Sequence, residues 1–260
     1  MGGFGGRSLL LFTRHARGRS HDLGKMDLRA LIGAFFTYPT VLLYLALTGA
    51  SACGALEYGI LGMPLQAMAT LAVTFVAYAV IWYGLHRWVL HSTLLYRWPL
   101  TARLWKRVHY DHHQDPHRME VLFGAPVTTV PTIVAVTLPL GWAMAGQAGA
   151  GFAMFAGFLI TLVYEFCHCC MHLNYEPGLA WLQRAKRLHM AHHFHNEAGN
   201  YGIISFWPDR LLGTLYEHAA DRPRSSTVFS LGYDATAAAR FPWVAALSSR
   251  TADTEDAEEG

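Results

Sequence analysis

Charged side chains are scarce in this 260-residue chain. Asp, Glu, Lys and Arg together make up 15% of it, whereas hydrophobic residues make up 53%. A soluble domain usually carries about 25% charged residues, so this composition argues against disorder and against an ordinary soluble domain. Four cysteines provide no disulfide framework, and a net charge of +2 is too small to suggest a nucleic-acid-binding protein.

The missing charges leave long uncharged blocks. Residues 30–56, 58–86 and 121–164 contain no Asp, Glu, Lys or Arg. A membrane-spanning helix needs about 20 apolar residues, so the first two blocks each hold one span and the third holds two. Buried core helices of a soluble protein are the alternative, which the coexistence of four such runs disfavours. We therefore predict spans at about 37–56, 65–87, 121–140 and 147–168, with the last two joined by a turn between Gly141 and Gly151.

Basic residues indicate the topology. Lys and Arg are absent from 30–86 and 119–183, and each of these stretches contains two predicted spans with their turn. Under the positive-inside rule both turns face outward and the basic segments face the cytosol. The prediction is an all-α integral membrane protein. Its four transmembrane helices form two hairpins, and a helical cap lies on the cytosolic side of the membrane. We divide the chain into a cytosolic N-terminal arm (1–36), a membrane domain (37–220) and a partly disordered C-terminal tail (221–260), with both termini cytosolic.

Histidine is abundant where charge is scarce, with 15 residues in the chain. Ten of them form four groups in the order HxxxxH, HxxHH, HxxxH and HxxHH, two groups after each predicted hairpin, at the cytosolic boundary. Residues i, i+3 and i+4 of a helix share one face, so the members of each of the last three groups can converge on one point or on two adjacent points. The HxxxxH pair lies roughly 140° apart on a regular helix and needs a helix end or a bulge to converge, or it serves two different metals. The ten are His86, His91, His109, His112, His113, His168, His172, His189, His192 and His193.

These spacings are typical of metal ligands. Imidazole suits iron, copper, zinc and nickel, whereas calcium and magnesium prefer oxygen. Ten imidazoles are too many for one ion, so we expect two ions with about five ligands each, although spacing alone does not choose iron over zinc. Interfacial histidines with solvated tips are the alternative, which this clustering disfavours. We interpret Cys167, Cys169 and Cys170 as packing residues. Residues that neighbour the ligands or face a substrate are predicted to be His117, His195, Asp111, Glu165, Tyr164 and Tyr201.

Residues 81–216 resemble the fatty acid hydroxylase/sterol desaturase superfamily of membrane di-iron enzymes. They carry its four histidine motifs in order, with a hydrophobic hairpin between the second and the third. The segments 86–91 (HRWVLH), 112–116 (HHQDP) and 120–126 (EVLFGAP) look like the fatty acid 2-hydroxylase branch. Two positions depart from that branch. Glu165 stands where the branch usually has Asp, and Pro208 is inserted between Trp207 and Asp209 where the branch has Trp followed directly by Asp. Residues 1–36 are too few for the fused cytochrome b5 domain of some members.

The resemblance implies O2-dependent hydroxylation of a lipid C–H bond, first of all in a fatty acyl chain. It implies two iron ions, which zinc can replace in the purified protein, with O2 as cosubstrate. It also implies an external electron donor, either a cytochrome b5-like protein or a ferredoxin with its reductase. A sterol or carotenoid hydroxylase or desaturase stays open. A metal transporter or sensor is disfavoured because the histidines avoid the bilayer midplane. A bacterial plasma membrane is favoured, or the endoplasmic reticulum in a eukaryote, and the oligomeric state stays open.

Overall fold

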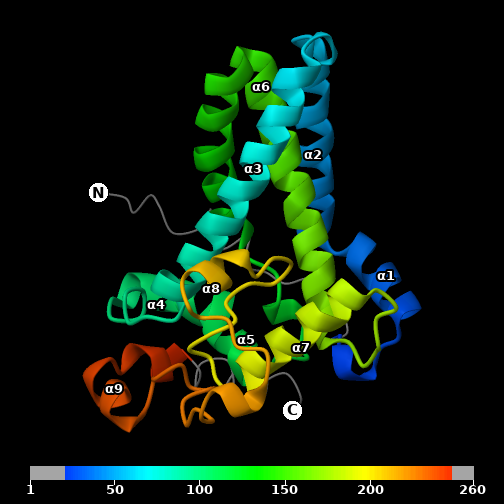
Figure 1. Cartoon of the computed structure of the whole chain (residues 1–260). Coiled ribbons are helices and arrows are strands. Elements are labelled where there is room, and N and C mark those ends of the chain that lie inside the picture. The colour runs from blue at the N-terminus through cyan, green and yellow to red at the C-terminus, as the bar shows by residue number, and fades with distance from the viewer. Residues whose placement is uncertain (1–20, 248–260) are drawn as a thin grey trace, which may run out of the picture.

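Three long helices stand upright on a layer of shorter ones in the computed structural model, which describes residues 21–247 (Figure 1). Within that range no β-strand occurs beyond an isolated bridge between Asp22 and Arg118, so the all-α prediction is confirmed. The start of the predicted N-terminal arm and the end of the predicted tail lie outside the described residues. The long helices are α2 (Pro39–Glu57), α3 (Pro64–Gly84) and α6 (Pro126–His172), and the shorter ones are α1 (Leu28–Thr37), α4 (Pro99–Trp105), α5 (Asp111–Gln114), α7 (Ala180–Phe194), α8 (Trp207–Leu211) and α9 (Ala235–Arg240).

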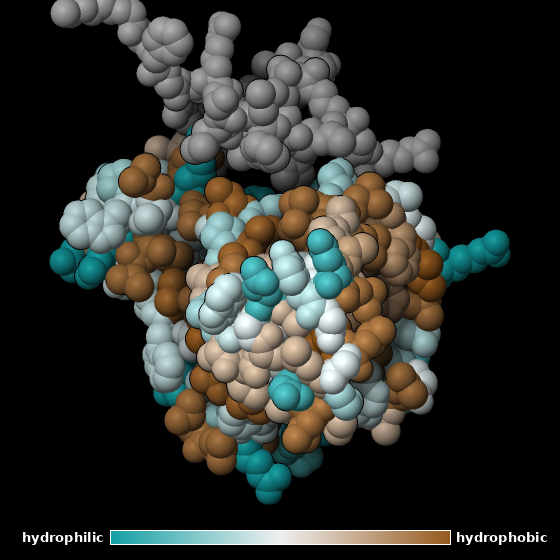
Figure 2. Space-filling model, turned by 90° about the horizontal axis from the view of Figure 1, so that it is seen from above, coloured by the Kyte–Doolittle hydropathy of each residue, from teal (hydrophilic) through white to brown (hydrophobic). Residues whose placement is uncertain are grey.

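The long helices are apolar enough to cross a membrane. Three stretches qualify by length and composition, at Pro39–Glu57, Pro64–Leu90 and Pro126–His172, with mean hydropathies of 1.5, 1.7 and 1.7. Only 17% of the apolar stretch is buried in each of the first two, so most of their apolar side chains face outward. Figure 2 shows apolar side chains around the bundle when it is seen from above. An apolar exterior of this extent suits lipid rather than water. The first two predicted spans coincide with α2 and α3.

Helix α6 reverses direction at its middle. Ala145 (φ −154°, ψ 34°) and Gly146 (φ 57°, ψ −139°) leave the helical region, and glycine adopts a positive φ without strain. The two halves pack closely against each other. A Cβ added to Gly157 in the second half would lie only 2.8 Å from the Thr137 Cγ2 atom in the first half. Figure 1 shows the halves in green and yellow-green, joined at the top. The turn lies within the predicted interval, whereas the first half begins at Pro126 rather than near 121, because proline favours the first position of a helix.

Two apolar clusters hold the shorter helices in place, one against the bundle and one against the C-terminal segment. Phe35 of α1, Tyr44 of α2 and Phe158 of α6 are at most 1% exposed and belong to one cluster. A second cluster joins Trp105 at the end of α4 to Val244 near the C-terminal end of the described range. Residues 231–247 thereby pack against the segment that leads from α3 to α5. This packing positions the chain after α8 beside the histidines.

Candidate metal centre

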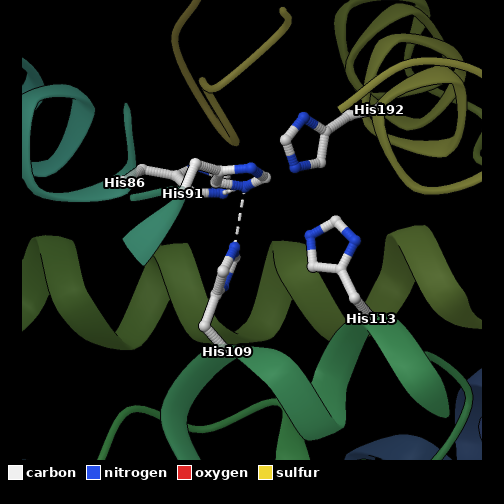
Figure 3. Close-up of side chains that lie close together, drawn as sticks. All are labelled: His86, His91, His109, His113 and His192. Carbon is white, nitrogen blue, oxygen red and sulfur yellow. Dashed lines mark hydrogen bonds between the residues drawn. The ribbon is translucent and has the colours of Figure 1, made fainter. Parts of the chain in front are cut away.

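The structure brings the ten clustered histidines together in two groups of five. In each group one ring nitrogen per residue lies within 4.8 Å of the corresponding atom of every other member. Figure 3 shows the rings of the first group turned toward one another from three separate parts of the chain. The expected division into two sets of about five is thus present in the geometry. We name these sets group A, with His86, His91, His109, His113 and His192, and group B, with His112, His168, His172, His189 and His193.

A π-helical turn makes the HxxxxH spacing work. Residues Leu85–Leu90 continue α3 as a π-helix, and the His91 backbone N–H donates to the His86 carbonyl at 3.1 Å. An i→i+5 hydrogen bond places residues i and i+5 one above the other on the same face. The Nε2 atoms of His86 and His91 consequently lie 3.1 Å apart, both in group A. A local bulge, one of the routes to convergence that the spacing allows, thus brings both residues into the same group.

Each HxxHH motif supplies both groups. His109 and His113, four residues apart, point into group A, while His112 between them points into group B. The second motif is the mirror case, because His189 and His193 belong to group B and His192 belongs to group A. Successive helical positions are rotated by about 100°, and here this rotation directs His112 and His113 to different groups. Both helices therefore run between the two groups.

Distances between ring nitrogens match those of ligands on one ion. A metal–imidazole bond is about 2.0–2.1 Å long, so two ligands at a right angle place their nitrogens roughly 2.9 Å apart. In group A the Nε2 atom of His91 lies 3.1 Å from that of His86 and 2.8 Å from that of His109. In group B the Nε2–Nε2 distances are 3.1 Å for His112–His168, 3.0 Å for His168–His189 and 2.9 Å for His172–His189.

Hydrogen bonding between the rings does not account for these contacts. A ring nitrogen carries either a hydrogen or a lone pair. The four contacting nitrogens of group B form a chain through His168 and His189. Three linear hydrogen bonds along it would require one nitrogen to donate twice, or to donate and accept at once. Lone pairs therefore face one another, and a cation between them would remove their repulsion, so the residues present fit a bound metal ion.

Burial keeps the imidazoles in the form that binds metals. Desolvation, with neighbouring imidazoles as a smaller cause, lowers the pKa of His113 and of His192 to about 3. The same causes hold the pKa of His109, His112 and His189 well below its usual value. These side chains are neutral at physiological pH. Neutral imidazole is the form that coordinates metals, so no proton has to be displaced.

Backbone carbonyls orient group A. The Nδ1 atoms of His86, His113 and His192 donate to the carbonyls of Tyr201 (2.6 Å), Val228 (2.9 Å) and Gly199 (2.7 Å). A carbonyl only accepts, so each of these rings carries its hydrogen on Nδ1 and turns the lone pair of Nε2 toward the centre. The Nδ1 atoms of all five group B histidines, by contrast, are buried with no hydrogen-bond partner among residues 21–247. Sequence reasoning missed the three carbonyls, because a backbone acceptor leaves no residue-type signal.

Of the other residues predicted to neighbour the ligands, four make hydrogen bonds or ion pairs that do not involve a ligand ring. The His117 Nδ1–H donates to the carbonyl of His172 at 2.9 Å, so His117 contacts a group B residue through the backbone. The His195 Nε2–H donates to the Arg222 carbonyl, away from both groups. Asp111 pairs with Lys106, and the buried Glu165 accepts a bond from the Gly124 N–H at 3.2 Å. The three clustered cysteines are buried and belong to neither group.

Two tyrosines connect both groups to one pocket. The Tyr201 ring centroid lies 5.5, 5.3 and 5.7 Å from those of His86, His91 and His192, and the Tyr164 ring lies 6.0 Å from that of His168. Both tyrosines line a pocket that is otherwise formed by the last turns of α3 and the loop 202–205. The pocket walls are Phe75, Tyr78, Ala79, Trp82, Tyr83, Tyr164, Tyr201, Gly202, Ile203, Ile204 and Ser205. An apolar ligand in it would lie beside both groups.

The sequence is similar to a known protein family and to characterised relatives. The model of the fatty acid hydroxylase family matches residues 71–214. The chain is 28% identical over 147 residues to a ceramide very long chain fatty acid hydroxylase of Saccharomyces cerevisiae, a match that covers 53% of this chain and 35% of the relative. It is 29% identical over 150 residues to a dihydroceramide fatty acyl 2-hydroxylase of Arabidopsis thaliana, which covers 56% of this chain and 60% of the relative. The chain thus spans less than two thirds of these curated relatives.

A solved structure shares the fold. It is described as full-length scs7p with only the hydroxylase domain visible, and it aligns with a TM-score of 0.53 at 21% sequence identity. The alignment covers 78% of this chain and 71% of the other. At this identity the likeness supports the arrangement of the helices alone.

Proposed function

Because the chain belongs to the fatty acid hydroxylase family, we propose that it is a membrane di-iron enzyme that hydroxylates a C–H bond of a fatty acyl chain. O2 is the cosubstrate, and an external donor, a cytochrome b5-like protein or a ferredoxin with its reductase, delivers two electrons. The observation that carries the proposal is the convergence of ten histidines into two groups of five. The names of the plant relatives favour carbon 2 of the acyl chain as the position attacked.

The histidines of group A hold one iron ion and those of group B hold the other. Iron bound in this way supplies O2-dependent oxidation of an unactivated C–H bond, which no side chain alone can perform. The protein keeps the imidazoles neutral by burial and fixes three of them through backbone carbonyls. Nine of the ten side chains are at most 7% exposed, so bulk water is kept away from the centre.

The acyl chain binds in the pocket between α3 and the loop 201–205. Its walls are largely aromatic, and Tyr201 and Tyr164 place it beside groups A and B. Phe75, at the far end of the pocket from the histidines along α3, is 44% exposed on the apolar face of that helix. A lipid tail can therefore enter sideways from the bilayer while its polar head stays at the interface.

The chain crosses the membrane four times. The spans are α2, α3 and the two halves of α6, and the histidine groups and both termini lie on the cytosolic side. This topology is supported by the three apolar stretches, by the reversal at Ala145 and Gly146, and by the confinement of Lys and Arg to the segments outside the hairpins. The membrane is a bacterial plasma membrane, or the endoplasmic reticulum if the source is eukaryotic.

Lipid analysis of a host that expresses the protein tests the proposed function. Cells with the wild-type chain should accumulate a hydroxylated acyl lipid that is absent from cells with His113→Ala. His218→Ala is the matched control, because His218 is exposed and belongs to neither group. It should give the wild-type lipid profile. If membranes that contain folded, iron-loaded protein show no new hydroxylated lipid, the proposed activity is wrong.

A further inference from the structure

We propose that Asp209 is a positioning residue of group A, which fixes the backbone that orients His86. The inference rests on the proposed function, because it assigns Asp209 a role in holding one of the two iron ions. Asp209 lies in the short helix α8 and is 0% exposed. A carboxylate buried to this degree is costly unless several donors surround it.

Three donors meet the Asp209 carboxylate. The backbone N–H groups of Tyr201 and Gly202 donate to Oδ1 and Oδ2, each at 2.8 Å, and the Thr214 hydroxyl donates to Oδ1 at 2.8 Å. A single carboxylate thereby clamps two successive peptide units. Hydrogen bonds to an ionised acceptor are about twice as strong as neutral ones, so the clamp holds this stretch of backbone firmly.

The clamped loop orients two rings of group A. The Tyr201 carbonyl accepts the hydrogen bond from the His86 Nδ1 atom at 2.6 Å. Two residues earlier, the Gly199 carbonyl accepts from the His192 Nδ1 atom at 2.7 Å. A shift of this loop would therefore disturb two of the five group A rings. The five Nδ1 atoms of group B make no hydrogen bond to this loop.

A second branch ties Asp209 to the helix that carries His86. The Arg87 guanidinium donates to the Tyr83 hydroxyl at 2.7 Å, and the Tyr83 hydroxyl lies 3.0 Å from that of Thr214. Since the Thr214 hydrogen is directed to Asp209, the Tyr83 hydroxyl is the donor in this contact. The chain of hydrogen bonds runs from the π-helical turn to the carboxylate. Asp209 thus fixes the loop and the helix end relative to each other.

Metal titration of the full-length protein in detergent tests the inference. Ferrous iron is added without oxygen to metal-stripped protein, and free ion is measured by competition with a chelator. The wild type should bind two ions. Asp209→Asn places an amide N–H against the Gly202 N–H, so one site should weaken about 10- to 100-fold while the other keeps its affinity. Thr214→Val removes one donor to Asp209 and the acceptor of the Tyr83 hydroxyl, and it should weaken the same site by less because both backbone N–H bonds to Asp209 stay.

Second substitutions assign the weakened site. In a His168→Ala background, which damages group B, Asp209→Asn should still weaken the remaining site. In a His91→Ala background, which damages group A, it should change nothing. Tyr216→Phe is the control, because it removes a buried hydrogen bond to the Asn196 carbonyl and keeps a ring whose histidine neighbour, His195, belongs to neither group; both sites should stay intact.

Two results would overturn the inference: unchanged affinities at both sites, or equal weakening of both, which marks a merely structural role. If Asp209→Asn does not fold, Thr214→Val decides by the same criterion. A wild-type chain that binds no iron would instead refute the proposed function, so the two failures can be told apart.

Discussion

The fold-back of α6 predicts opposite signs for two glycine-to-alanine substitutions. Gly149 faces Gly141 across the turn, and a Cβ on Gly149 would clash with the Gly141 carbonyl oxygen and lie 2.9 Å from the Ala145 Cβ. Gly49 is also inside a long helix, α2, but its added Cβ would meet nothing within 4 Å. Alanine is favoured over glycine in a helix by about 1 kcal/mol, and overpacking against fixed backbone costs about 1–3 kcal/mol.

Gly49→Ala should therefore stabilise the protein by about 1 kcal/mol, and Gly149→Ala should destabilise it by up to about 2 kcal/mol after the propensity gain is subtracted. For a chain of this size 1 kcal/mol shifts Tm by about 2–4 °C. Thermal denaturation in detergent, followed by circular dichroism, should show Tm rising for the first variant and falling for the second. In a continuous helix Gly141 and Gly149 would lie about 12 Å apart. A rise of Tm for both variants would refute the close hairpin.

Three further predictions concern the metal centre and the pocket. Chelation of both ions should lower Tm in detergent, because an ion present at 100 times its Kd contributes about 2.7 kcal/mol to stability; an unchanged Tm would contradict metal binding by the folded state. Acid should destabilise the metal-free protein: the pKa of His113 and His192 is about 3 when folded and about 6.5 when unfolded, so only the unfolded chain gains these protons as pH falls below 6.5. Each residue then removes about 1.4 kcal/mol per pH unit down to about pH 3, and a Tm independent of pH in this window would contradict their buried neutral state. Ala79→Trp should fill the pocket and abolish lipid hydroxylation with both irons retained, whereas retained activity would place the acyl chain elsewhere.

Much of the architecture was predictable because membranes impose simple rules. Uncharged runs located α2 and α3, and the third run was correctly expected to contain a turn. Helix ends were harder to predict, as the late start at Pro126 shows, because residues 121–125 are as apolar as the helix that follows. The ten histidines were identifiable from their spacing. Their allocation to two groups was not, since it depends on how separate helices face one another.

Residues that support the histidines were the least predictable. Asp209 drew notice in the sequence only as half of an interrupted Trp-Asp pair, because only the folded loop supplies its three donors. The carbonyl of Val228 is likewise invisible in a sequence, although it orients His113 from a segment that we interpreted as a tail. Supporting contacts of this kind are made by backbone atoms, which every residue possesses. Composition and spacing therefore describe the ligands better than they describe what holds them.

The allocation of the histidines makes the two halves of the chain interdependent. The half that ends with α5 supplies four imidazoles to group A and lends His112 to group B; the half that begins with α6 supplies four to group B and lends His192 to group A. The exchange is reciprocal. The spacing within the histidine motifs of the two halves differs by one residue, the extra one between His86 and His91 that the π-helical turn accommodates. Cutting the chain at the loop before Pro126 would leave two pieces, each one ligand short of its own set. Neither centre is complete until both halves have docked.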